Sequence, residues 1–336
     1  MRVRIEDVAK AAGVSMKTVS RVLNNEPTVR EETRARVQAV AQSMNYRPDP
    51  SARSLAGRRS YLVALLYDNP SANYLMEILM GVVDACQAHH YGMVVQPLNY
   101  ESPDFLRSVE SLVQFSKLDG LILTPPITDS VELLDRLDQL CMPYSCVSPR
   151  NREGTIGVTL EEHDAAADMI EYLVSLGHTR IAHIKGHPSH GASEWRLAGY
   201  RSGLRRAGLR YDPTLVIDGE FSFDSGARAA EQLFDLEQPP TAIFAANDDM
   251  AAGVMSVAHS RGLSIPGDVS VCGFDNTPMS RQIFPALTTV HQPTQEMGRL
   301  ATVELLKAIK DPASGQMLRM PYALQLRQST GPVPRH

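Results

Sequence analysis

Residues Ile5 to Asn25 read IEDVAKAAGVSMKTVSRVLNN, and this stretch decides how the beginning of the 336-residue chain folds. Its first half repeats apolar residues at the three- and four-residue spacing of one helix face, at Ile5, Val8, Ala9 and Ala12. Gly13 suits the positive φ at the end of a helix, and Ser15 suits the N-cap of the next helix. Two short helices joined by a tight turn that contains Gly predict a helix-turn-helix.

The second predicted helix has one apolar and one polar face. Val19, Val22 and Leu23 fall on the apolar face. The opposite face carries cations and small hydrogen-bonding side chains, at Lys17, Ser20, Arg21 and Asn24. Such a face is either solvated or set against DNA, where cations meet phosphates and guanine edges. Because the turn glycine, the cap and the polar face occur together, the sequence favours DNA.

The same residues carry a long motif. The pattern D-V-A-x-x-A-G-V-S-x-x-T-V-S-R-V-L-N stands here from Asp7 to Asn24, and it continues as TRARVQAVAQSMNYRPDPSARSLAG from Thr33 to Gly57. The segment closely resembles the headpiece of the lactose/galactose repressor family (LacI–GalR). The resemblance implies a sequence-specific DNA-binding transcriptional regulator that responds to a ligand.

The resemblance also assigns roles to residues of the second helix. Met16, Lys17 and Arg21 match the positions that read bases in the major groove. Met16 would touch a thymine methyl group, and Lys17 would prefer guanine O6 and N7. Residues that contact or position phosphates in the family match Ser15, Thr18, Ser20 and Asn24.

A third helix, predicted from Arg30 to Met44, closes a headpiece of residues 1–46. Prolines at 48 and 50 then open a hinge of residues 47–60, with a short helical stretch at about 51–56 that composition alone explains as a linker. The resemblance instead implies a hinge helix that pairs with its dimer mate in the minor groove. Leu55 would wedge between base pairs, and Arg53 would assist at phosphates.

Beyond Ser60, short apolar runs alternate with helical patterns. The predicted strands are Tyr61–Leu66, Gly92–Pro97, Gly120–Thr124, Tyr144–Val147, Arg180–Lys185, Leu215–Ile217, Ala242–Ala245 and Ser270–Gly273. The predicted helices include Leu75–His89, Glu161–Leu176, Trp195–Ala207, Asp248–His259 and Thr294–Ile309. This alternation predicts two doubly wound parallel-sheet subdomains with a ligand between them, at the carboxyl ends of the strands.

The family resembles periplasmic sugar-binding proteins in this region, so the resemblance implies a periplasmic-binding-protein-like core in which the chain crosses between subdomains three times. Crossings are expected near Thr159, Val290 and Met320. The N-subdomain would then comprise residues 61–159 and 291–320, and the C-subdomain residues 160–290 and 321–330.

Motifs of the C-subdomain supply candidate effector contacts through the resemblance. Arg196, in EWRLAGY, matches an arginine that clamps ligand oxygens, although a surface ion pair is the alternative. Asn247 and Asp248, in FAAND, match an A-x-N-D motif, and Asp248 alternatively caps its helix. Asp275, in GFD, matches a carboxylate that contacts the ligand.

Further effector candidates are aromatic or variable. Phe221 and Tyr74 match aromatic positions that contact the ligand, although either alternatively belongs to the core. His190 and Ala192 align with positions that vary with the ligand, and Ala192 offers no hydrogen bond. Asp68 and Asn73, after the first predicted strand, are weaker candidates.

Charge and cysteine content indicate where the chain acts. Residues 1–60 hold 12 Lys and Arg against 6 Asp and Glu, whereas the remainder holds 21 against 32. A basic head concentrates attraction to nucleic acid at one end and predicts steep salt dependence. The four cysteines are scattered and predict reduced thiols, and no apolar run is long enough for a membrane span or a signal peptide. A cytoplasmic, nucleoid-associated protein is expected.

No catalytic constellation, cofactor motif or metal-ligand spacing is recognisable, so no enzyme, cofactor or metal is expected. The preferred hypothesis is a homodimeric repressor of carbohydrate-utilisation genes that a sugar releases from a pseudo-palindromic DNA operator. The alternatives are regulation by a purine or another metabolite that acts as corepressor, and a sugar-binding transport component. The basic headpiece and the lack of a signal peptide argue against transport.

Overall fold

The computed structural model describes residues 3–23, 28–46, 59–151 and 154–333. It divides into two compact units, Met1–Tyr61 and Leu62–His336, which are considered separately. Three of the predicted DNA-binding residues, Asn24, Arg53 and Leu55, lie outside the described residues.

The first unit is a bundle of three short helices, α1 (Ile5–Ala12), α2 (Met16–Leu23) and α3 (Glu31–Ser43). Gly13 ends α1 with a φ of 65°, and the Ser15 hydroxyl accepts a hydrogen bond from the Thr18 amide over 3.2 Å at the start of α2. The apolar faces of all three helices meet in a small core that includes Val8, Val19 and Val37. The predicted helix-turn-helix and its closing helix are therefore confirmed.

The second unit contains two six-stranded sheets. The first sheet has the order β11-β5-β4-β3-β1-β2, with β1 (Leu62–Tyr67), β2 (Gly92–Pro97), β3 (Gly120–Leu123), β4 (Tyr144–Val147), β5 (Gly157–Leu160) and β11 (Met317–Met320). The second has the order β12-β10-β9-β8-β6-β7, with β6 (Ile181–Ile184), β7 (Val216–Ile217), β8 (Ala242–Ala245), β9 (Ser270–Asp275), β10 (Thr288–His291) and β12 (Ala323–Gln325). All pairs between these strands are parallel except β10 with β12.

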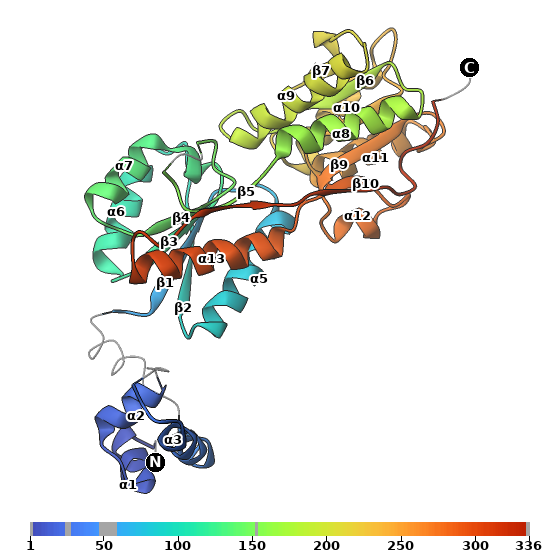
Figure 1. Ribbon diagram of the computed structural model, residues 1–336. Coiled ribbons are helices and arrows are strands. Elements are labelled where there is room, and N and C mark those ends of the chain that lie inside the picture. Colours follow the sequence, from blue (N-terminus) through green and yellow to red (C-terminus); the bar gives the residue numbers. More distant parts are fainter. Residues whose placement is uncertain (1–2, 24–27, 47–58, 152–153, 334–336) are drawn as a thin grey trace. The chain divides into compact units, whose positions relative to one another are not determined.

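Helices cover both faces of each sheet, and each sheet with its helices is called a lobe (Figure 1). In the first lobe, α5 (Ala72–Ala88) and α13 (Thr294–Lys310) lie side by side on one face, and α6 (Phe105–Phe115) and α7 (Val131–Gln139) cover the other. In the second lobe, α8 (Glu162–Ser175) and α9 (Gly191–Arg206) cover one face, and α10 (Phe223–Phe234) and α11 (Asp248–Ser260) the other.

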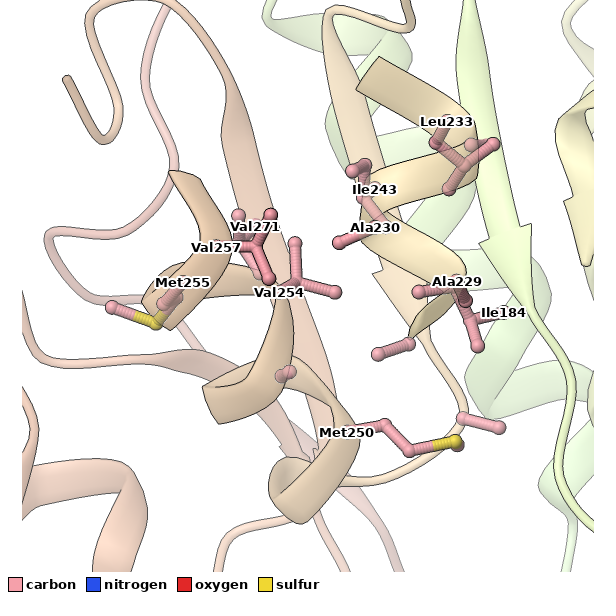
Figure 2. Close-up of a cluster of buried hydrophobic side chains, with 14 of the residues drawn as sticks. Ile184, Ala229, Ala230, Leu233, Ile243, Met250, Val254, Met255, Val257 and Val271 are labelled. Carbon is pink, nitrogen blue, oxygen red and sulfur yellow. The ribbon is translucent and has the colours of Figure 1, made fainter. Parts of the chain in front are cut away.

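The core beneath α10 and α11 illustrates how the sequence builds these layers. Figure 2 shows Leu233 of α10 and Val254 of α11 on the same side of the sheet as Ile243 of β8 and Val271 of β9. These side chains are fully buried, which stabilises the lobe by about 1.5–3 kcal/mol for each large aliphatic side chain removed from water. Because the strands are covered on both faces, they read as apolar runs, which is why most were predictable.

The chain passes between the two lobes three times. It leaves the first sheet after β5, returns to the first lobe with α13 after β10, and leaves again between β11 and β12. Strands β5, β10 and β11 thus end at Leu160, His291 and Met320, where the chain crosses. This arrangement brings the carboxyl ends of strands from both sheets together.

Candidate functional site: the polar face of a short helix and a pocket between two lobes

The α2 helix presents a polar surface opposite its buried face. Met16 is 50% exposed, and Ser15 and Lys17 are also exposed, whereas Thr18, Ser20 and Arg21 are half-buried. Val19 and Val22 on the other side have no exposed surface. No acidic residue lies in the first turn of α2. The first turn is therefore free of a carboxylate that would repel a phosphate.

In the second unit, a pocket lies between the two lobes and contains about 370 Å³ of space free of protein atoms, part of which is open to solvent. Residues of both lobes line it: Asn69, Ser71, Tyr74, Pro125, Ser148, Glu162, His190, Ala192, Arg196, Phe221, Asn247 and Asp275. The list includes six of the seven side chains predicted to contact an effector.

Arg196, from the second turn of α9, occupies the polar end of this pocket and is buried. One terminal nitrogen, Nη1, donates a hydrogen bond to the carbonyl oxygen of Ala246 and lies 3.7 Å from Oδ1 of Asp275. Nη2 lies 3.5 Å from Oε1 of Glu162, and the guanidinium stacks 3.7 Å from the ring centroid of Phe274. The structure therefore excludes the alternative of a surface ion pair for Arg196, because Arg196, Glu162 and Asp275 are all buried.

Asp275 ends β9 with a φ of 114°, in the left-handed region that L-residues rarely adopt. Its Oδ1 accepts a hydrogen bond from Nε2 of Gln292 over 2.6 Å. Burial raises the pKa of Asp275 well above its usual range, and Arg196 opposes that rise. Burial also raises the pKa of Tyr74, and the charges of Asp275 and Glu162 add to that rise. Tyr74 is therefore a neutral hydrogen-bonding wall of the pocket.

Phe221 and His190 form the aromatic side of the pocket, with their ring centroids 5.1 Å apart. The Phe221 backbone has a φ of 58°, and its carbonyl oxygen accepts a hydrogen bond from Nδ2 of Asn247 over 3.0 Å. A Cβ atom on Gly186 would overlap the Phe221 ring, so glycine at that position makes room for it. Burial, together with the charges of His187 and Arg196, lowers the pKa of His190 to about 3. The imidazole is therefore neutral near pH 7.

Asp248, which the resemblance matches to an effector contact, does not line the pocket in this structure. Its carboxylate is fully buried beside the pocket rather than in its lining. Oδ2 accepts hydrogen bonds from the amide and hydroxyl of Thr277, and Oδ1 accepts one from the Thr289 hydroxyl over 2.6 Å. Asp248 is also not the cap of α11, because Asn247 holds that position and accepts a hydrogen bond from the Met250 amide. Asp248 thus joins the ends of β9 and β10 to α11.

Two sets of hydrogen bonds cross between the lobes beside the pocket. The Ser71 hydroxyl and Nδ2 of Asn73, at the start of α5, donate to the carboxylate of Asp249 in the first turn of α11, the latter over 2.9 Å. On another side, the Gly191 amide at the start of α9 donates to Oδ2 of Asp129 over 2.9 Å. These contacts define a closed arrangement of the lobes.

Of the two weaker candidates, Asn73 takes part in this lobe-to-lobe contact and Asp68 accepts a hydrogen bond from the Tyr100 amide over 2.7 Å; neither lines the pocket. Sequence reasoning missed the lining residues Asn69, Ser71, Pro125, Ser148 and Glu162. Several of them follow the carboxyl ends of β1, β3, β4 and β5, a position that could have indicated them.

Within the described part of the chain, no group of three His, Cys, Asp or Glu side chains is placed to hold a metal ion. Among the same residues, no helix has the length and apolar character needed to cross a bilayer. His183 is stacked between Tyr200 and Phe244 in the second lobe.

Comparison with known proteins agrees with both units. The family model of the bacterial regulatory proteins of the lacI family matches residues 4–49, and that of the periplasmic binding protein-like domain matches residues 170–330. Catabolite control protein A of Priestia megaterium is 32% identical over 98% of this chain and 100% of its own length. The HTH-type transcriptional repressor CytR of Escherichia coli (strain K12) is 33% identical over 98% of this chain and 97% of its own.

Solved structures agree as well. A lac repressor dimer bound to operator and the anti-inducer ONPF has a TM-score of 0.78 at 29% identity, and a complex of the regulator CelR with cellobiose has a TM-score of 0.74 at 29% identity. Both alignments cover 98% of this chain and 100% of the solved chain. The two units therefore define a helix-turn-helix protein with a periplasmic-binding-like ligand domain. The chain belongs to the lacI family of bacterial regulatory proteins and is a ligand-responsive, DNA-binding transcriptional regulator.

Proposed function

We propose that this regulator is a homodimeric repressor of carbohydrate-utilisation genes that leaves a pseudo-palindromic operator when a sugar binds between its lobes. The observation that carries the proposal is the pocket, in which a guanidinium, carboxylate oxygens and a neutral phenol face an aromatic wall of Phe221 and His190. Hydroxyl groups both donate and accept hydrogen bonds, and the face of a sugar ring packs on aromatic rings, so this set suits a polyol. The likeness to the CelR–cellobiose complex supports it.

In this proposal Arg196, Asp275 and Asn247 hydrogen-bond the effector, Tyr74 closes the pocket from the first lobe, and the rings of Phe221 and His190 pack against it. Asp248 has no direct part, because its carboxylate is fully buried outside the lining, where it accepts hydrogen bonds from threonines.

The proposed DNA contacts follow the polar surface of α2. Met16, Lys17 and Arg21 read base edges in the major groove, and side chains that position phosphates are proposed at Ser15, Thr18, Ser20 and Asn24. Arg53 and Leu55 act in the minor groove, Leu55 as a wedge. The exposure of Lys17 and the burial of Val19 and Val22 on the opposite side support this orientation of α2.

The proposed division of the ligand domain follows the sheet order. The N-subdomain comprises residues 61–159 and 291–320, and the C-subdomain residues 160–290 and 321–330, in agreement with the strands that form each sheet. A sugar that contacts both subdomains changes their relative orientation and hence the spacing of the two headpieces in a dimer. Such coupling is reciprocal, so operator DNA must weaken binding of the sugar by the same factor.

The test is release from operator DNA. Neutral sugars, sugar phosphates and nucleobases are screened for thermal stabilisation of the full-length protein, and each hit is added to the protein on its operator. We expect a sugar to release the wild type. The Arg196→Lys variant keeps the charge but loses the fork of donors, so it should bind operator normally and require roughly 10- to 100-fold more sugar. Arg201→Lys, on the exposed face of α9, is the matched control. Normal release of the Arg196→Lys variant would contradict the assigned role of Arg196.

A purine corepressor is the second candidate, because the Phe221 and His190 rings would also pack against a planar base. In the same screen, a nucleobase that stabilises the protein and tightens operator binding would favour this candidate over a sugar inducer.

A further inference from the structure

The charges that line the pocket are unevenly divided. Five of its lining side chains are ionisable, namely Tyr74, Glu162, His190, Arg196 and Asp275. Among the described residues of the lining, Arg196 supplies the single permanent cation, whereas Glu162 and Asp275 carry carboxyl groups; burial raises the pKa of Asp275, and Arg196 opposes that rise. His190 and Tyr74 are neutral near pH 7, because burial lowers the pKa of the imidazole to about 3 and raises that of the phenol. The lining therefore carries no excess of positive charge.

The positive charge of Arg196 is also already engaged. Glu162 and Asp275 lie 3.5 and 3.7 Å from its terminal nitrogens, and the exposed fraction of each of the three side chains is 5% or less. A further donor position is taken by the carbonyl oxygen of Ala246, and the flat face of the guanidinium lies on Phe274. An anionic ligand would find a guanidinium against which the carboxyl groups of Glu162 and Asp275 already lie.

The described residues around the pocket add further acidic side chains. Asp249 and Asp129 accept hydrogen bonds on two sides of the pocket, and Asp248 lies behind Asp275. The nearby cation Arg150 lies 3.6 Å from Glu194. A phosphate or carboxylate on the ligand would be taken out of water and set close to Glu162 and Asp275. Juxtaposing like charges in a desolvated site costs several kcal/mol.

Glu162 adds a carboxyl group to the lining of the pocket, beside Arg196. It is the first residue of α8, where a carboxylate is generally favourable because of the helix dipole, and this effect alone would explain a solvent-facing glutamate. Its neighbour Glu161 fits that description, since it is half-exposed and pairs with Arg319 over 2.9 Å. The carboxylate of Glu162 is instead 4% exposed and lies against Arg196 in the pocket lining.

We propose that the effector of this regulator is an uncharged molecule and that Glu162, together with Asp275, excludes sugar phosphates and sugar acids from the pocket. Glu162 acts as a specificity determinant: it engages Arg196, so that the guanidinium orients neutral hydroxyl groups but does not serve as an anion receptor. The inference rests on the proposed function only in that the pocket is the effector site, and it goes further by assigning a charge class.

The first experiment identifies the ligand without assuming its class. Wild-type full-length protein is incubated with a metabolite extract, and the small molecules that remain bound after gel filtration are identified by mass spectrometry. We expect an uncharged compound. Enrichment of a sugar phosphate, a uronate or a nucleotide would overturn the charge assignment. Enrichment of a neutral nucleobase would support the charge assignment and contradict the sugar inducer, so the two proposals fail separately.

The second experiment tests Glu162 itself with matched ligands. Neutral hexoses and disaccharides are compared with the uronates derived from them, in which one CH₂OH group becomes a carboxylate of similar size. Binding is followed through Trp195, the only tryptophan of the chain, which precedes Arg196 in α9. In the wild type we expect each uronate to bind at least about 10-fold more weakly than its neutral parent.

The dissociation constant of a uronate divided by that of its neutral parent gives a binding ratio. Replacing Glu162 by Gln should lower this ratio about 10-fold, because the change removes one negative charge beside Arg196 while retaining the shape of the side chain. Glu161→Gln, which makes the same change one residue away and outside the lining, should leave the ratio as in the wild type. A wild type that binds a uronate as tightly as its parent overturns the proposal. An equal ratio in the Glu162→Gln variant and the wild type overturns the role of Glu162.

Discussion

Nδ2 of Asn73 donates a hydrogen bond to Oδ1 of Asp249 over 2.9 Å, and this bond joins the start of α5 in the first lobe to the first turn of α11 in the second. The Ser71 hydroxyl donates a hydrogen bond to Oδ2 of Asp249 and accepts one from the Tyr74 amide. Ser71 therefore caps α5 and also contacts the opposite lobe. Asp249 therefore links closure of the lobes to the position of Tyr74 in the pocket.

Removing this carboxylate should loosen the closed arrangement. In Asp249→Ala, two hydrogen bonds across the lobes are lost, and at about 1 kcal/mol each we expect roughly 5- to 30-fold weaker effector binding. The radius of gyration of the ligand-free protein should increase in solution scattering. Asp224→Ala is the matched control, because Asp224 is also the second residue of a helix, α10, and is exposed. A radius of gyration and an affinity like those of the wild type would show that Asp249 does not hold the lobes.

Gly186 should be as important to the pocket as the side chains that line it. A Cβ at this position would meet the Phe221 ring, so Gly186→Ala must displace the ring from the pocket wall. We expect effector binding to weaken at least about 10-fold while operator affinity is kept. In a Phe221→Ala background the ring is absent, and Gly186→Ala should then have little further effect. Effector titration of the wild type, the two single variants and the double variant measures this. If the losses of effector affinity in the single variants add up in the double variant, the steric relationship between Gly186 and Phe221 is refuted.

Acid should destabilise the second lobe through His183. Burial lowers the pKa of His183 from 6.5 to about 4, so between these values the unfolded chain binds a proton that the folded chain does not. The stability that neutral His183 confers is complete above pH 6.5 and is lost as the pH falls toward 4. Asp248, whose pKa burial raises to about 7, acts with the opposite sign, so a variant must isolate the histidine.

The variant His183→Phe keeps a ring between Tyr200 and Phe244 but cannot titrate. Loss of the hydrogen bond between Nδ1 of His183 and the Phe244 carbonyl lowers its stability equally at every pH. Between pH 7.5 and 5 the wild type should lose about 2 kcal/mol relative to this variant, measured by urea unfolding. Exposed His89, replaced by Gln, provides a control. If the free energies of unfolding of the wild type and His183→Phe change in parallel with pH, His183 does not cause the loss of stability in acid.

The headpiece was predictable from sequence because its determinants are local. Gly13, Ser15 and the apolar spacing of α1 and α2 lie within one short stretch, and each acts on a neighbouring residue. The core strands of both lobes were predictable for a related reason, since burial on both faces leaves uninterrupted apolar runs. Strands β5, β10, β11 and β12 were not predicted: they are only three or four residues long and mix threonine, histidine, arginine or glutamine with apolar residues.

The pocket was predictable only in part. Arg196, Asp275 and Phe221 belong to motifs or matched positions, whereas Ser71, the N-cap of α5, and Ser148, directly after β4, reach the pocket from the other lobe and belong to no motif. The position of Asp248 outside the lining was not predictable, because its partners Thr277 and Thr289 lie about thirty to forty residues further along the chain. A motif gives the residue type at a strand end, but long-range hydrogen bonds decide which way the side chain turns.

The most direct test of the contact between α2 and base edges is footprinting of the purified full-length protein on its own genomic DNA at low ionic strength. We predict two protected half-sites related by dyad symmetry. Lys17→Ala and Arg21→Ala should abolish this specific protection, whereas Arg36→Ala, which removes an exposed cation from α3, should retain it. Absence of any protected tract for the wild type, with and without metabolites, or full protection by the Lys17→Ala and Arg21→Ala variants, would contradict the role of α2.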